Sequence, residues 1–130
     1  MMDNLEILNL VNNCLEELPQ SMSGMKKLRI LRLGNNRLKK LPKGFGSFPS
    51  IEILDLSYNQ LCEDGLPSNF FNMSSLRYEL QRTLWNFKTM FFRALYLSDN
   101  EFEHLGSEIR NLKSLRILAL RNNELVQCDH

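Results

Sequence analysis

A pattern of spaced leucines recurs along this chain with a period of 23 residues, and it constrains the fold more than any other feature of the sequence. Each copy has apolar residues at its first, fourth, sixth and eleventh positions and an asparagine at its ninth. The copies start near residues 5, 28, 51, 92 and 115. One copy is too small to bury its own apolar side chains, so we expect the copies to stack and to share a continuous core.

The apolar residues at the start of each copy alternate with other residues as they do in a β-strand, where successive side chains point to opposite faces. The pattern is the LxxLxLxxNxL signature of leucine-rich repeats, whose strands line the inside of a curved stack. The sequence therefore predicts an α/β solenoid with about five parallel strands on its concave face and irregular or short helical segments on its convex face. The apolar residues expected on the convex side are Met22, Met25, Phe45, Phe48, Phe70, Met73, Ile109 and Leu112.

An asparagine stands at the same position of every copy, and the five are Asn13, Asn36, Asn59, Asn100 and Asn123. The chain turns after each strand and leaves backbone N–H and C=O groups without partners in the sheet. An asparagine amide can both donate and accept hydrogen bonds, and a buried polar group left unpaired costs about 1–3 kcal/mol. We therefore expect these asparagines to hold the turns rather than to bind a ligand.

The 130 residues, 43% of them hydrophobic, have room for one core, and we expect a single leucine-rich repeat domain over residues 1–130. Terminal repeats of a solenoid usually carry polar caps, because an open end exposes core side chains and a free strand edge. Both caps are missing from this sequence, so we expect self-association through the uncapped ends. Two interpretations follow: the chain is a segment of a longer array, or it is a truncated product without stable function.

Composition argues against several classes of function. The net charge of +1 gives no general attraction to nucleic acid, and no apolar run approaches the roughly 18 residues of a membrane-spanning helix. The three cysteines are scattered and odd in number, which favours a reducing cytoplasm over a disulfide-bonded secreted fold. There is no glycine-rich phosphate loop and no metal-ligand spacing, so we expect no enzyme activity, no cofactor and no metal site.

Eight basic residues and no acidic residue lie in the stretch from Lys26 to Lys43. In the repeat frame their side chains spread over several faces, so a solvated surface is the first interpretation. The alternative is a site for an acidic protein surface or a phosphoinositide headgroup.

Copies three and four start 41 residues apart. The third copy is two residues longer than the others before its LP pair at 66–67, and a further 16 residues, about 77–92, stand before the fourth. Leu80, Leu84, Phe87 and Phe91 have the spacing of an amphipathic helix. The insertion is either a binding element that offers this helix to a partner or an accident of gene structure that a loop tolerates. We expect it to interrupt the central sheet.

The residues between the strand leucines face the concave side in four rows. Because neighbouring strands lie about 4.8 Å apart, the rows form a surface roughly 20 Å wide. It mixes aliphatic, aromatic and charged side chains, which suits a folded protein partner, and tyrosine is enriched at interface hot spots. The residues predicted to bind a protein are Asn9, Arg32, Asp55, Tyr58, Tyr96, Ser98, Asp99 and Arg121, with Tyr58 and Tyr96 as the preferred anchors.

Four stretches are more specific than the repeat signature: GFGSFP at 44–49, IEILDLSYN at 51–59, LPSNFF at 66–71 and RALYLSDNEFE at 93–103. They resemble the Ras suppressor family of the leucine-rich repeat superfamily, and the likeness covers nearly all of residues 3–127 except the insertion. The longer third repeat is shared as well. Gly106 and Asp129 depart from the family pattern, which has proline at both positions.

The resemblance implies a non-catalytic cytoplasmic adaptor at integrin adhesion complexes (focal adhesions) that restrains Ras signalling. It implies a protein partner, the LIM-domain adaptor PINCH, which joins integrin-linked kinase and parvin, and contact through the concave face. From the residues alone, the alternative is a generic cytosolic leucine-rich repeat protein that acts as a regulatory or targeting subunit.

Overall fold

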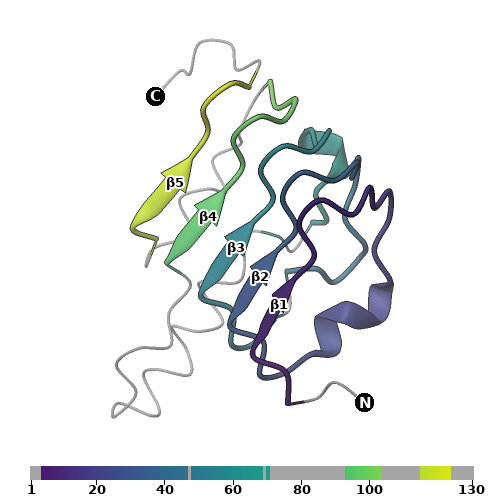
Figure 1. Cartoon of the computed structure of the whole chain (residues 1–130), viewed down its shortest axis with the longest axis vertical. Helices are drawn as coiled ribbons and strands as arrows, with labels where there is room; N and C mark the ends of the chain where they lie inside the picture. Colours follow the sequence, from purple (N-terminus) through teal and green to yellow (C-terminus); the bar gives the residue numbers. More distant parts are fainter. Residues whose placement is uncertain (1–3, 47, 69, 71–92, 104–114, 124–130) are drawn as a thin grey trace.

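Five short strands form one parallel sheet in the computed structural model, which describes residues 4–46, 48–68, 70, 93–103 and 115–123. The strands are β1 (Ile7–Asn9), β2 (Ile30–Arg32), β3 (Ile53–Asp55), β4 (Ala94–Tyr96) and β5 (Ile117–Ala119). They lie side by side in sequence order on one face of the molecule, with the connecting segments of the first three repeats behind them (Figure 1). This arrangement confirms the predicted leucine-rich repeat solenoid.

Equivalent positions of neighbouring repeats are aligned across the whole sheet. The second residues of the strands are successive Cα partners, namely Leu8, Leu31, Leu54, Leu95 and Leu118. β3 and β4 keep this register although their first residues are 41 positions apart. The expectation that the insertion interrupts the central sheet is therefore wrong, because the extra length enters before β4 and leaves the strand residues in register. The insertion itself, at about 77–92, lies outside the described residues.

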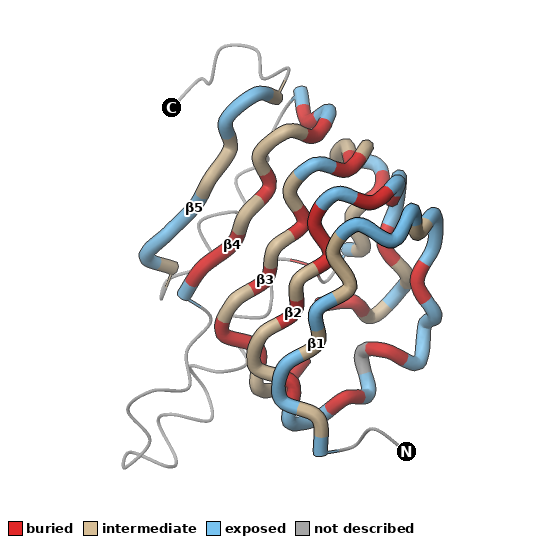
Figure 2. Tube along the Cα trace, in the orientation of Figure 1, coloured by how far each residue is buried: buried red, intermediate tan, exposed pale blue. Residues whose placement is uncertain are grey.

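Leucines on the inner side of the strands form the core, as the repeat pattern predicts. In the second, third and fourth copies these side chains are fully buried, whereas in the first and last copies their equivalents are half-buried or exposed (Figure 2). The difference follows from stacking, because a central repeat is covered on both flanks and a terminal repeat on one. The leucines with no exposed surface are Leu28, Leu31, Leu33, Leu38, Leu54, Leu56, Leu61, Leu95 and Leu97.

Within the described residues, the convex side is built from irregular segments and two short 3-10 helices, η1 (Gln20–Gly24) and η2 (Glu63–Gly65). Its apolar residues are buried as predicted, and the rings of Phe45 and Phe48 meet edge to face with their centroids 5.1 Å apart. Burial of such side chains contributes about 1.5–3 kcal/mol each. Met22, Met25 and Phe70 are also buried, and Met73, Ile109 and Leu112 lie outside the described residues.

η2 lies close against the backbone of the preceding repeat. A Cβ atom at Gly65 would stand 2.3 Å from the carbonyl oxygen of Lys39, so only glycine fits there without a shift. The amide of Leu41 donates a hydrogen bond of 2.7 Å to the carbonyl oxygen of Gly65 and holds this contact. Glycine thus lets the longer third repeat stack as tightly as the others.

The repeated asparagines form a ladder of side-chain hydrogen bonds between turns. Oδ1 of Asn36 accepts hydrogen bonds from the amides of Asn13 and Leu15 in the preceding repeat. Its Nδ2 donates to the carbonyl oxygens of Leu10 and Leu33. The same pattern recurs at Asn59, Asn100 and Asn123. These amides satisfy the backbone groups that the turns leave unpaired, as predicted.

Candidate protein-binding face

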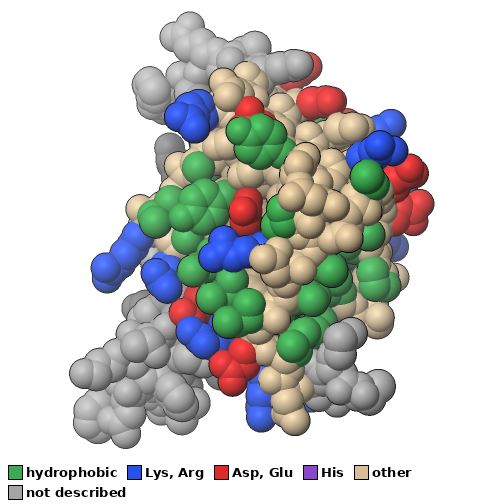
Figure 3. All heavy atoms as spheres, in the orientation of Figure 1, with side chains coloured by type: hydrophobic (Ala, Val, Ile, Leu, Met, Phe, Trp, Pro, Cys, Tyr) green, Lys and Arg blue, Asp and Glu red, His purple; other side chains and the backbone are tan. Residues whose placement is uncertain are grey.

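The concave face carries the predicted binding residues in two groups. The first group is a row across the middle of the sheet, in which Asn9, Arg32, Asp55 and Tyr96 are successive partners on β1 to β4. These side chains project from the side of the strands opposite the leucine core. An aliphatic row runs beside them and consists of Ile7, Ile30, Ile53, Ala94 and Ile117. Figure 3 shows hydrophobic side chains mixed with basic and acidic ones over this face.

The second group lies at the turns that follow β3, β4 and β5, and it consists of Tyr58, Ser98, Asp99 and Arg121. The amide of Tyr58 donates to the carbonyl oxygen of Ser98 at 3.0 Å, and the amide of Asp99 donates to that of Arg121 at 2.8 Å. The amide of Arg121 also donates to the hydroxyl of Ser98 at 3.1 Å. These links hold the second group as one unit.

Asp55 connects the two groups. Its Oδ1 accepts a hydrogen bond of 3.0 Å from the amide of Ser57, the residue before Tyr58. The Oδ1 atom of Asn9 likewise accepts a hydrogen bond of 3.1 Å from the amide of Val11, two residues further along the chain. The structure therefore places four of the predicted residues in one row across the strands and the other four at the turns that follow β3, β4 and β5.

Tyr58 occupies a backbone position that disfavours a bulky side chain. The turn residues Asn12, Asn35, Tyr58, Asp99 and Asn122 all have φ between 55° and 65°. Asparagine and aspartate tolerate this left-handed conformation, whereas it costs other side chains roughly 1–2 kcal/mol. Elsewhere in the column the side chains hydrogen-bond to each other, Asn35 to Asn12 and Asn122 to Asp99. Tyr58 instead leaves 59% of its surface exposed.

Sequence reasoning missed a column of charged residues just before the strands. It consists of Glu6, Arg29, Glu52, Arg93 and Arg116, one residue in each repeat. Arg29 Nε lies 2.9 Å from Glu52 Oε2, and Arg29 Nη1 lies 3.2 Å from Glu6 Oε1. Hydrogen bonds to Glu52 and to Glu6 stabilise the charged guanidinium and raise the pKa of Arg29. The signal for this column was in the sequence, because a charged residue follows the first apolar residue of every copy.

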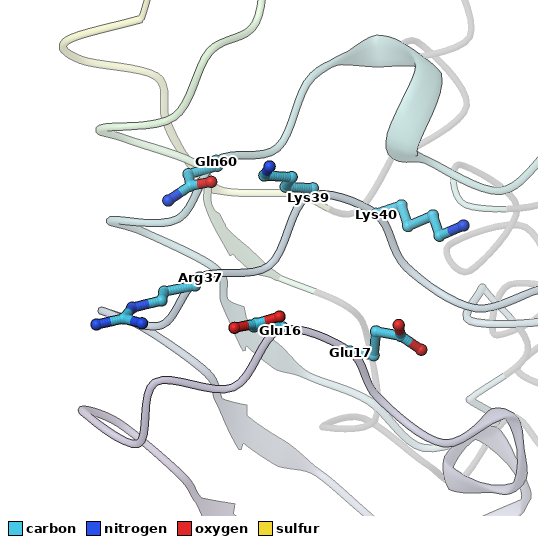
Figure 4. Close-up of a pocket in the computed structure, with 6 residues that line it drawn as sticks. All are labelled: Glu16, Glu17, Arg37, Lys39, Lys40 and Gln60. Atoms are coloured by element: carbon cyan, nitrogen blue, oxygen red, sulfur yellow. The ribbon is translucent and has the colours of Figure 1, made fainter.

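The basic stretch from Lys26 to Lys43 does not form one patch. Arg29 is paired within the charged column, and Arg32 lies in the concave row. A hollow of about 460 Å³ on the loops after the strands is lined by Glu16, Glu17, Arg37, Lys39, Lys40 and Gln60 (Figure 4). Carboxylates of the first repeat thus stand beside the lysines of the second, and the surface there carries both signs of charge.

The described part of the chain holds two free thiols and no group of side chains that could bind a metal ion. Within residues 4–46, 48–68, 70, 93–103 and 115–123, no three His, Cys, Asp or Glu side chains are grouped so that they could hold a metal ion. None of the helices in these ranges has the length and apolar character needed to span a bilayer. Cys14 is exposed and Cys62 is half-buried, both as free thiols, and Cys128 lies outside the described residues.

Two models of the leucine-rich repeat match the sequence, one over residues 3–61 and the other over residues 50–73. Together they span more than half of the chain, and the five-stranded parallel solenoid agrees with them. Residues 3–73 therefore match leucine-rich repeats, and the fold is a leucine-rich repeat solenoid, a fold that offers extended concave surfaces for binding. No curated protein sequence matches the chain significantly.

Solved structures also resemble this chain. One is a chain in the crystal structure of the BIR3–SERK2 complex from Arabidopsis thaliana, with a TM-score of 0.69 and 29% sequence identity. The match covers 92% of this chain and 57% of that chain, so this chain spans little more than half the length of the similar structure. The similar chain occurs in a complex of proteins, and this finding together with the repeat matches supports a protein-binding role for the fold.

Proposed function

We propose that this chain is a non-catalytic protein-binding module that holds its partner on the concave face. The observation that carries the proposal is the exposed ring of Tyr58 on a left-handed backbone. This conformation destabilises the fold, and the exposed ring adds little core packing to offset the cost. Strained residues of this kind gather at functional sites, and tyrosine is enriched among the residues that dominate binding energy.

The surroundings of Tyr58 support the same conclusion. The backbone amide of Tyr58 donates a hydrogen bond to the carbonyl oxygen of Ser98 in the next repeat, and this bond fixes the backbone that carries the ring. Tyr96 offers a second, half-buried ring from β4, the strand beside β3. Two rings placed on neighbouring, rigid repeats lose little conformational freedom when a partner binds, which favours affinity.

The partner in this proposal is the LIM-domain adaptor PINCH, joined to integrin-linked kinase and parvin at focal adhesions in the cytoplasm. There the chain would act as an adaptor that restrains Ras signalling. The support is the resemblance of residues 51–59 and 93–103 to the Ras suppressor family. These two stretches contain Tyr58, Tyr96, Ser98 and Asp99.

Replacing Tyr58 with asparagine tests the proposal. We expect Tyr58→Asn to raise the free energy of unfolding by about 1 kcal/mol, because asparagine tolerates the left-handed backbone. We expect the same change to weaken binding to the LIM domains of PINCH by about tenfold or more, since an interface hot spot contributes about 2 kcal/mol or more. Urea unfolding and isothermal titration calorimetry measure the two effects. Lys40→Ala, at the hollow, is the control that should change neither.

Binding that survives Tyr58→Asn unchanged would show that Tyr58 does not anchor the partner and would remove the observation on which the proposal rests. If the unmodified chain does not bind PINCH, capture from cytosol distinguishes the alternatives. A phosphatase or ligase among the captured proteins would indicate a regulatory or targeting subunit. Chaperones alone would indicate a product without stable function.

A further inference from the structure

We infer that the β4–β5 half of the concave face binds an acidic polypeptide segment that carries an apolar residue between its carboxylates. The inference rests on the proposed function and adds the chemistry of the partner. It comes from the distribution of charge along the solenoid, which differs between the two halves of the face.

The charges in the β1–β3 half largely neutralise each other. Arg29 bridges Glu6 and Glu52 through ion pairs of 3.2 and 2.9 Å. Glu52 is almost fully buried, so its carboxylate pairs with arginines of this chain and is not accessible to a partner. Arg32 and Asp55 are direct partners in the sheet register. This half therefore offers no surplus of positive charge to a partner.

Among the described residues, the β4–β5 half has a surplus of positive charge, since it carries Arg93, Arg116 and Arg121 against Asp99. Arg93 Nε stands 3.7 Å from Glu52 Oε1, a longer contact than the one Arg29 makes with the same carboxylate. Arg116 and Arg121 are exposed, and no carboxylate among the described residues forms an ion pair with either. Figure 3 shows basic side chains gathered on the β4–β5 side of this face.

The spacing of these arginines indicates a polypeptide rather than a small anion. Arg116 precedes β5 and Arg121 follows it, and five extended residues span roughly 17 Å. Between them Ile117, 44% exposed, and Ala119 offer an apolar floor. Ala119 is the direct partner of Tyr96, so the aromatic ring borders a position with only a methyl group. An extended segment with carboxylates at both ends and an apolar side chain between them matches this surface.

A defined peptide tests the inference. The probe is a fluorescein-labelled seven-residue peptide with two glutamates at each end and a central leucine, titrated with the full chain and followed by fluorescence anisotropy. We expect binding at low ionic strength that weakens as salt is added. We expect about tenfold weaker binding to the double variant Arg116→Glu/Arg121→Glu, because both attractions become repulsions. These changes leave the ion pairs of Glu52 intact, and circular dichroism verifies the fold.

The matched control is Lys39→Glu/Lys40→Glu, which changes the net charge equally at the hollow on the loops and should leave peptide affinity unchanged. Equal losses in both double variants would mean that only net charge matters and would overturn the inference. Equal binding of a peptide with lysine in place of glutamate would overturn it too. Tighter binding of a single-stranded oligonucleotide of the same charge would assign the surface to nucleic acid instead.

Two further outcomes are informative. Self-association that the Arg116→Glu/Arg121→Glu variant abolishes would assign the surface to a second copy of the chain and overturn the inference. Absence of peptide binding would overturn it as well, but would leave the proposed function standing as long as Tyr58→Asn weakens PINCH binding. The two proposals can therefore fail separately.

Discussion

At the scale of single residues, two neighbouring positions in each turn have opposite roles. Asn36 is buried, and its amide group serves backbone atoms of its own turn and of the preceding one. Tyr58 stands one position before the equivalent asparagine of the next repeat and is exposed on a strained backbone. The asparagine position stabilises the turn. At the position before it, the third repeat carries an exposed tyrosine whose left-handed backbone lowers stability.

Replacing Asn36 with leucine should destabilise the protein without removing a binding contact. The substitution leaves the amides of Asn13 and Leu15 without their side-chain acceptor. Because each buried unsatisfied group costs about 1–3 kcal/mol, we expect a loss of about 3 kcal/mol in urea unfolding. Asn13→Leu is the matched control, since its exposed side chain donates only to the carbonyl oxygen of Val11 among the hydrogen bonds of the described part. Unchanged stability together with lost partner binding would contradict the assignment.

At the scale of elements, the backbones of neighbouring repeats approach so closely at some positions that a side chain does not fit between them. η2 illustrates this, because Gly65 touches the backbone of Lys39 in the preceding repeat where a Cβ atom would clash. η1 has no such constraint at Gly24, where a Cβ atom would meet nothing within 4 Å. The two 3-10 helices therefore respond differently to the same substitution.

Gly65→Ala should lower the free energy of unfolding by about 1–3 kcal/mol, because the clash is with backbone that cannot rotate away. Gly24→Ala should leave stability unchanged or raise it by about 0.4–1 kcal/mol, since alanine restricts the unfolded chain. Thermal and urea unfolding of the pair give the comparison. Equal effects of the two substitutions would mean that η2 does not lie against the second repeat as described.

At the scale of the whole molecule, the solenoid is a stack in which each repeat contacts only its neighbours. Its central leucines are fully buried, while Ile7 at one end is 54% exposed and Ile117 at the other is 44% exposed. The outer edges of β1 and β5 have no partner strand within the described sheet. Apolar surface and open strand edges together favour association.

Produced as these 130 residues alone, the chain should associate in a concentration-dependent manner. We expect Ile7→Lys/Ile117→Lys to shift the population toward monomer, because a charge on an edge strand opposes further pairing. Sedimentation velocity over a range of concentrations measures the effect. If the unmodified chain stays monomeric at every concentration, the terminal repeats do not mediate self-association.

The core leucines, the asparagine ladder and the concave rows could all be predicted from the sequence. Each depends on a residue type that recurs every 23 positions, so a local pattern reveals a shared environment. The eight predicted binding residues were placed on one face by the same reasoning. Their roles in binding remain predictions.

Other features came only from the tertiary structure. β4 keeps its register with β3 across 41 positions, Glu52 pairs with arginines in the neighbouring repeats, and the amide of Leu41 bonds to Gly65. These features depend on which atoms meet when one repeat lies on another. A periodic pattern indicates that repeats stack, but side-chain pairing and close backbone approach depend on the distances between repeats, and only the folded stack sets those distances.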